Sequence, residues 1–79
     1  MNVRVEHDPD ANALYVWLSD KPYAFGEDID HERRIDYAED GTPIGVEFLC
    51  VRGGVDISDI PHASEIAEAL RDQNIKLLA

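Results

Sequence analysis

The chain has 79 residues, 44% of them hydrophobic, and its seventeen acidic side chains against seven Lys and Arg give a net charge of −10. This length predicts one domain over residues 1–79 and excludes a two-domain enzyme with an interdomain cleft. Because the few basic residues are scattered, the composition also disfavours direct binding to nucleic acid or to an anionic membrane surface.

Alternating residues predict two N-terminal strands. Val3, Val5 and His7 lie on one face of a short strand, which ends at the turn formers of residues 8–10. Residues 13–18 read Ala-Leu-Tyr-Val-Trp-Leu and are apolar on both faces. A strand of this kind is central and covered on both sides, so another element is expected over Tyr15 and Trp17.

Three more strands follow. A weak strand carries Tyr23, Phe25 and Ile29, and residues 33–37 form the next one. The Asp40-Gly41 pair is a strong hairpin signal, and it leads into a return strand over residues 44–51. In that strand Gly45 indicates a bulge or the close approach of another backbone, and Cys50 continues the apolar face as a buried thiol.

The C-terminal part predicts one amphipathic helix, over about residues 61–74. Apolar side chains recur at helical spacing between Pro61, in the first turn, and Asn74, near the C-cap. We expect this helix to pack on the sheet over Tyr15 and Trp17. The apolar tail Ile75 to Leu78 can dock on its own sheet or on that of a neighbouring subunit, and the sequence leaves both open.

The predicted fold is α+β: an antiparallel β-meander of four or five strands with one C-terminal α-helix packed on the sheet. A core this small gives little net stability. We therefore expect a homodimer, formed through a strand edge or through helix packing.

Acidic residues concentrate in residues 27–40, which contain seven acidic side chains and two basic ones, Arg33 and Arg34. A solvated face that keeps the protein soluble is the plain interpretation, and a docking surface for a basic partner is the sharper one. The candidate interface residues are Tyr15, Trp17, Glu27, Asp28, Asp30 and Glu32. Large aromatic side chains are common interface anchors as well as core residues.

No catalytic, cofactor-binding or metal-ligating residue is predicted. His7, His31 and His62 are too far apart in sequence for a usual zinc motif, and the acidic pairs are better explained as turn formers. The single cysteine and the absence of a signal-like or membrane-spanning segment predict a reducing, cytoplasmic location.

Two segments resemble a known family. The motif Asp8-Pro9-x-Ala11-x-Ala13-Leu14-Tyr15-Val16 and the motif Asp40-Gly41-x-x-Ile44-Gly45-Val46-Glu47-x-Leu49 are similar to the two signatures of DUF2283, a family of small bacterial proteins of unknown function. The resemblance covers about residues 3–50. Asn12 stands where an Asp is usual, which puts a carboxylate role at that turn in doubt, and the tail from residue 53 extends past the shortest members.

The resemblance implies a small β-meander protein without defined catalytic residues. Some members are encoded beside small toxin candidates and are regarded as candidate antitoxins. The leading hypothesis is therefore a non-enzymatic, antitoxin-like binding protein whose residues 27–40 meet a small basic toxin. The alternative is a self-associating structural or interaction module that has no toxin partner.

Overall fold

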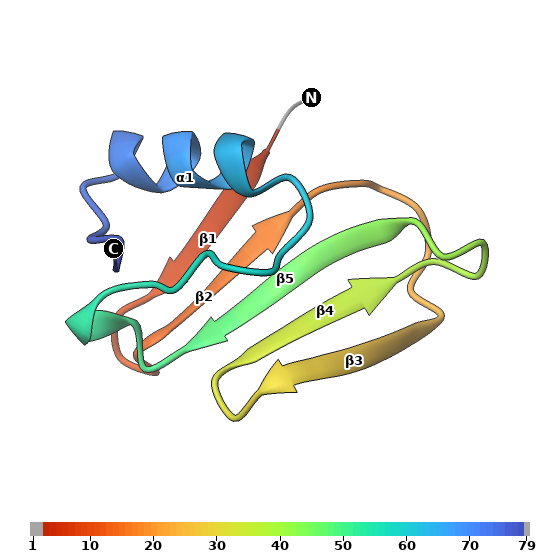
Figure 1. Ribbon diagram of the computed structural model, residues 1–79, viewed down its shortest axis with the longest axis horizontal. Coiled ribbons are helices and arrows are strands. Elements are labelled where there is room, and N and C mark those ends of the chain that lie inside the picture. The colour runs from red at the N-terminus through yellow and green to blue at the C-terminus, as the bar shows by residue number, and fades with distance from the viewer. Residues whose placement is uncertain (1–2, 79) are drawn as a thin grey trace.

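The computed structural model describes residues 3–78, in which five antiparallel strands form one open sheet and a single α-helix follows them (Figure 1). The strands are β1 (Arg4–Asp8), β2 (Ala13–Trp17), β3 (Phe25–Asp30), β4 (Arg33–Tyr37) and β5 (Pro43–Leu49). A short 3-10 turn (Val51–Gly53) leads toward the helix α1 (Ala63–Asp72). The predicted α+β class is confirmed.

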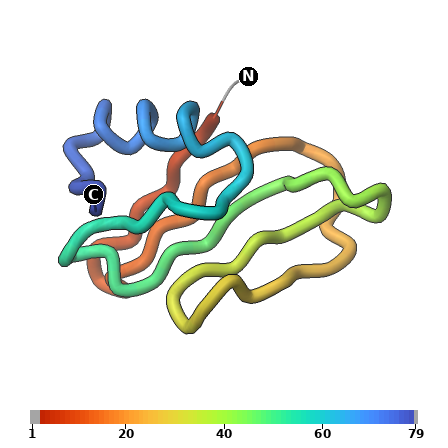
Figure 2. Tube along the Cα trace, viewed as in Figure 1, coloured from red at the N-terminus to blue at the C-terminus, as the bar shows by residue number. Residues whose placement is uncertain are grey.

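The strand order is β1-β2-β5-β4-β3, which differs from a continuous meander at one connection. The chain leaves β2 and crosses one end of the sheet to start β3 at the far edge, as the tube in Figure 2 shows. Lys21 in this link is held by Asp40 (2.7 Å) and Thr42 (3.1 Å), next to the β4–β5 turn. The connection brings β5, the most buried strand, to the centre beside β2, in the spatial arrangement of a Greek key.

The hydrophobic core lies on one face of this sheet. Leu14, Val16, Val46 and Phe48 point to this face and are almost fully buried, because they alternate with outward residues along β2 and β5. They pack against the C-terminal segment, residues 50–78, which we call the lid. The lid's own buried side chains are Val51, Val55, Ile60, Ile66, Ala67 and Leu70.

The expectation that the helix covers Tyr15 and Trp17 is wrong. Ile66 and Leu70 of α1 join the cluster around Leu14 and Val16, which is the other face of β2. Both faces of β2 are apolar, so its alternation does not reveal which one is covered. The cross-strand partners of Tyr15 decide the choice, since Glu6 and Glu47 flank it and cannot be buried under an apolar helix.

Arg33 joins the lid to the sheet and is the one charged side chain that is buried among residues 3–78. Its Nε donates to the Asp30 carboxylate (2.9 Å), while its Nη1 donates to the backbone oxygens of Asp56 (3.2 Å) and Ser58. One guanidinium therefore ties the β3–β4 hairpin to the segment that precedes α1.

The end of β5 differs from its predicted course. Cys50 adopts a left-handed backbone (φ 57°) that stops the strand, so its thiol is exposed and not buried as expected. The same turn reverses the alternation and sends Val51 into the core. Asn12, also left-handed (φ 54°), fixes this corner because its Oδ1 accepts the N–H of Arg52 (2.9 Å), a bond that an aspartate could also accept.

The helix begins two residues later than predicted, because His62 has a positive φ (55°) that no helical residue adopts. It ends in a Schellman motif, in which the left-handed Asn74 (φ 59°) confirms the predicted C-cap region. In the apolar tail, Leu77 forms a β-bridge with Val55, and both Ile75 and Leu77 pack on the core.

We predict that Arg33→Ala lowers the free energy of unfolding by about 2–3 kcal/mol, because two lid carbonyls lose their donor and a buried cavity remains. Arg34→Ala, on the exposed side of the same strand, should cost about 1 kcal/mol or less. Urea denaturation followed by circular dichroism measures both values. Equal losses in the two variants would contradict the assigned role of Arg33.

Candidate functional site

The face of the sheet opposite the lid carries a mixed set of aromatic and charged side chains, which we call the open face. Cross-strand register places its members side by side on all five strands. They are Arg4, Glu6, Asp8, Ala13, Tyr15, Trp17, Gly26, Asp28, Arg34, Asp36, Gly45, Glu47 and Leu49.

Tyr15 and Trp17 form the aromatic centre of the open face. Their rings meet edge to face with centroids 4.7 Å apart, and both side chains are half-buried. The hydroxyl end of the Tyr15 ring lies against Gly45 on β5, where a Cβ atom would overlap it. The predicted close approach at Gly45 is therefore made by a side chain, and the register of β4 and β5 is also irregular beside it.

A hydrogen-bonded network fixes Tyr15. Its hydroxyl donates to Asp36 Oδ2 (2.7 Å), and Asp36 also lies 3.4 Å from the guanidinium of Arg34. Arg34 continues the network to Asp28 (3.0 Å) on the edge strand β3. Burial of the phenol and its bond to Asp36 raise the pKa of Tyr15 well above its usual range, so the hydroxyl remains a donor at physiological pH.

A second cluster lies at the β1 side of the open face, which we call the Trp17 corner. The Trp17 Nε1 donates to Glu6 Oε1 (3.0 Å), and the guanidinium carbon of Arg4 lies 5.0 Å from the centroid of the Trp17 ring. The same Glu6 oxygen is 3.6 Å from the Arg4 guanidinium. The corner thus combines a carboxylate, an indole face and a cation.

The predicted interface residues are distributed over two faces. Tyr15, Trp17 and Asp28 share the open face, whereas Glu27 pairs with Ile35 and so points to the lid side of β3. Asp30 ends β3 and Glu32 lies in the β3–β4 turn that follows, and the Asp30 carboxylate accepts the Glu32 N–H and holds Arg33. Residues 27–40 are therefore not one acidic surface, since the strand alternation divides them.

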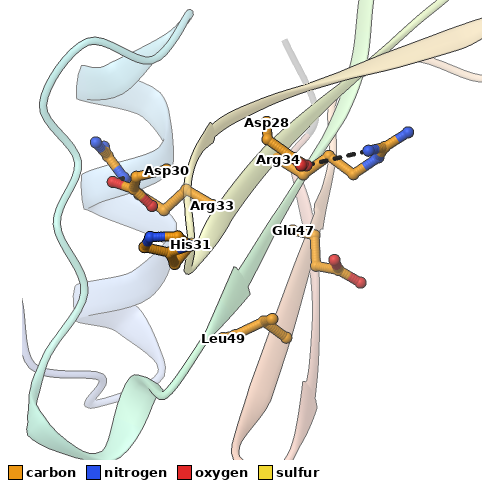
Figure 3. A pocket seen from close by; sticks show the side chains of 7 residues that line it. All are labelled: Asp28, Asp30, His31, Arg33, Arg34, Glu47 and Leu49. Carbon is orange, nitrogen blue, oxygen red and sulfur yellow. Dashed lines mark hydrogen bonds and ion pairs between the residues drawn. The ribbon is translucent and has the colours of Figure 1, made fainter.

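The hollow at the β3–β4 end does not gather its side chains around one point. Figure 3 shows Asp30, His31 and Arg33 on one side of the sheet, and Arg34, Asp28, Glu47 and Leu49 on the other. Within residues 3–78, no three His, Cys, Asp or Glu side chains are grouped so as to hold a metal ion. In the same range, no helix has the length and apolarity to cross a membrane.

The exposed thiol of Cys50 is not activated. A hydrogen bond with Glu32 and the negative charge of that carboxylate raise the pKa of the thiol. Because the thiolate is the nucleophilic form, this environment reduces its reactivity at neutral pH.

Sequence reasoning missed several members of the open face, namely Arg4, Glu6, Arg34, Asp36 and Glu47. Each lies at an outward position of its strand, so the alternation of side chains along that strand already indicated its exposure. Arg4 and Glu6 reach this face through the β1–β2 hairpin. Arg34, Asp36 and Glu47 join it through the pairing of β5 with β2, which the sequence did not reveal.

Comparison with known proteins identifies the family. A family model described as "Protein of unknown function (DUF2283)" matches residues 4–52, which include all five strands. No curated protein and no solved structure matches significantly. The chain therefore belongs to this family, as the resemblance of its two motifs indicated, and the match ends where most of the lid begins.

We predict that the contribution of Tyr15 to stability falls at alkaline pH. Because the folded state holds the pKa of Tyr15 above its unfolded value of about 10, its contribution is complete below that pH and is lost as the pH rises further. Between pH 10 and pH 11.5, wild type should lose up to about 1 kcal/mol per pH unit more than Tyr15→Phe. Urea titrations at several pH values test this, and parallel curves for the two proteins would contradict it.

We also predict that Gly45→Ala destabilises the protein by about 2 kcal/mol or more, because its methyl group overlaps the Tyr15 ring. In a Tyr15→Ala background the same change should cost less than about 0.5 kcal/mol, since the ring is gone. The double-mutant cycle is measured by urea denaturation. Additive losses would show that the strand backbone, and not the ring, requires glycine here.

Proposed function

We propose that this chain, a member of the DUF2283 family of unknown function, is a non-enzymatic binding protein that docks a basic protein partner on its open face. An antitoxin-like role toward a small basic toxin is the form of this proposal that we favour. The partner would leave the protein's own fold unchanged, because the hydrophobic core lies between the lid and the other face of the sheet.

The open face itself carries the proposal. Tyr15 and Trp17 are half-buried on this face, Leu49 on the same face is 41% exposed, and the lid covers only the other face. Aromatic side chains surrounded by polar groups are typical of interface centres, where they lose water on binding.

Its charge favours a basic partner. Five carboxylates, those of Glu6, Asp8, Asp28, Asp36 and Glu47, accompany the two guanidiniums of Arg4 and Arg34 on this face. The whole chain, this face included, carries a net charge of −10, which steers a cationic protein toward it. Charge complementarity of this kind mainly raises the association rate and the specificity.

A basic toxin suits this arrangement because a nucleic-acid-binding or nucleic-acid-cleaving protein presents a positive surface to phosphates. An acidic face that covers this surface would block its access to nucleic acid.

The alternative is a self-associating module, and a different surface favours it. Tyr23 and Phe25, next to and in the edge strand β3, are 57% and 43% exposed, and Phe25 stacks on Tyr37 with centroids 5.1 Å apart. A second copy that packs on this stack would bury apolar area beside the open face, since the Tyr23 hydroxyl accepts a hydrogen bond from Arg34 of that face (3.4 Å). This surface is also where we place the expected homodimer.

We predict that co-expression with the product of the adjacent gene yields a complex that co-purifies and protects cells from that product's toxicity. Glu47→Lys should weaken both effects, because it reverses a charge on the open face, whereas Glu68→Lys on the exposed side of α1 should retain them. Neither co-purification nor protection by wild type would count against the antitoxin-like role.

The salt dependence of binding and the molecular mass in solution distinguish docking of a basic partner from self-association. A complex held by charge should dissociate as ionic strength rises past about 0.5 M, while an apolar dimer persists. Light scattering at micromolar concentration measures the dimer directly. A monomer mass throughout that range would remove the self-associating alternative.

A further inference from the structure

We propose that the Trp17 corner is a binding site for an arginine side chain of the partner, and that the chain's own Arg4 occupies this site when the partner is absent. The inference rests on the proposed function, because it names the chemical group that a basic partner presents to the open face. It also names an internal competitor for that group.

The corner has the two parts that recognise a guanidinium. The face of the Trp17 ring attracts a cation, and the carboxylate of Glu6 supplies an acceptor at its rim. The bond from Trp17 Nε1 to Glu6 Oε1 (3.0 Å) holds both parts in one fixed relation. The site is therefore formed before any partner arrives, which reduces the ordering cost of binding.

Arg4 shows that a guanidinium fits there, yet its own contacts are weak. Its side chain is 68% exposed, and its nearest approach to the Glu6 oxygen, 3.6 Å, is longer than a hydrogen bond. Exposed ion pairs of this kind add little stability. A guanidinium that arrives from solvent can approach Glu6 more closely, since its backbone is not fixed to β1.

The geometry favours arginine over lysine. A planar guanidinium can stack on the indole while its N–H groups reach the carboxylate, whereas an ammonium is a compact and strongly hydrated charge. The nearby Tyr15 edge and the Asp36 carboxylate extend the surface toward β4 for neighbouring residues of the partner.

A second copy of this chain is a poorer occupant. Two open faces in contact would bring ten carboxylates together with only four guanidiniums. Like charges placed opposite each other cost stability, so a basic partner is the occupant to which we commit.

The test uses the intrinsic fluorescence of Trp17, which is the only tryptophan of the chain. The full-length protein is titrated at low ionic strength with a short Gly/Ser peptide that carries two arginines. Peptides of the same length with lysine or with citrulline, the uncharged analogue of arginine, serve as ligand controls. We expect a saturable change in Trp17 emission that follows the order arginine, lysine, citrulline and decreases with salt.

Variants separate the corner from general charge attraction. Arg4→Ala should tighten binding of the arginine peptide about two- to fivefold, because the internal competitor is removed, and Glu6→Gln should weaken it by a similar factor. Arg71→Ala and Glu68→Gln make the same charge changes on α1 and should have smaller effects than their open-face counterparts. Urea denaturation confirms that each variant is folded.

Three results would overturn the inference. The first is equal affinity for arginine and lysine peptides, the second is an Arg4→Ala effect no larger than that of Arg71→Ala, and the third is a Glu6→Gln effect no larger than that of Glu68→Gln. If both cationic peptides still bind in a salt-sensitive way, any of these results refutes only the arginine site, and the proposed docking of a basic partner still stands. Absence of binding by either cationic peptide at low salt would refute the proposed function as well.

Discussion

The buried guanidinium of Arg33 is the interaction on which the arrangement of the molecule depends. It holds the lid against the β3–β4 hairpin through Asp56 and Ser58, so that the segment before α1 runs across the core. With the lid fixed there, one face of the sheet is shielded from water, and the side chains buried on it include Leu14, Val16, Val46 and Phe48. The other face stays accessible, and it is the surface on which we propose that a partner docks.

Much of the fold was predictable from local patterns. The β1–β2 turn follows from Pro9 between two aspartates, the β4–β5 turn from Asp40-Gly41, and the helix from apolar residues at its period. These signals act over a few residues, which is why the strands and the helix lie near their predicted places. Cys50 and His62 were exceptions, because a positive φ at a residue other than glycine leaves little trace in the sequence.

The strand order and the covered face could not be read in this way. A strand such as β2, apolar on both sides, satisfies either choice until its neighbours are known. The pairing of β5 with β2 puts Glu47 beside Tyr15 and Gly45 beside Trp17, and this long-range contact makes one face polar. Asp36 and Glu47 join the candidate site through the same contact and were not predicted, whereas Tyr15 and Trp17 lie on one strand and were.

The two motifs that carried the family resemblance are one structural unit in the fold. Tyr15 and Val16 from the first motif pair with Glu47 and Val46 from the second, and the Tyr15 ring fills the space above Gly45. The valines close the core, whereas the tyrosine and the glutamate shape the open face. A single strand pair thus contributes to stability on its inner side and to the proposed binding surface on its outer side. Tyr15 belongs to both, because its hydroxyl holds Asp36 and its ring requires Gly45.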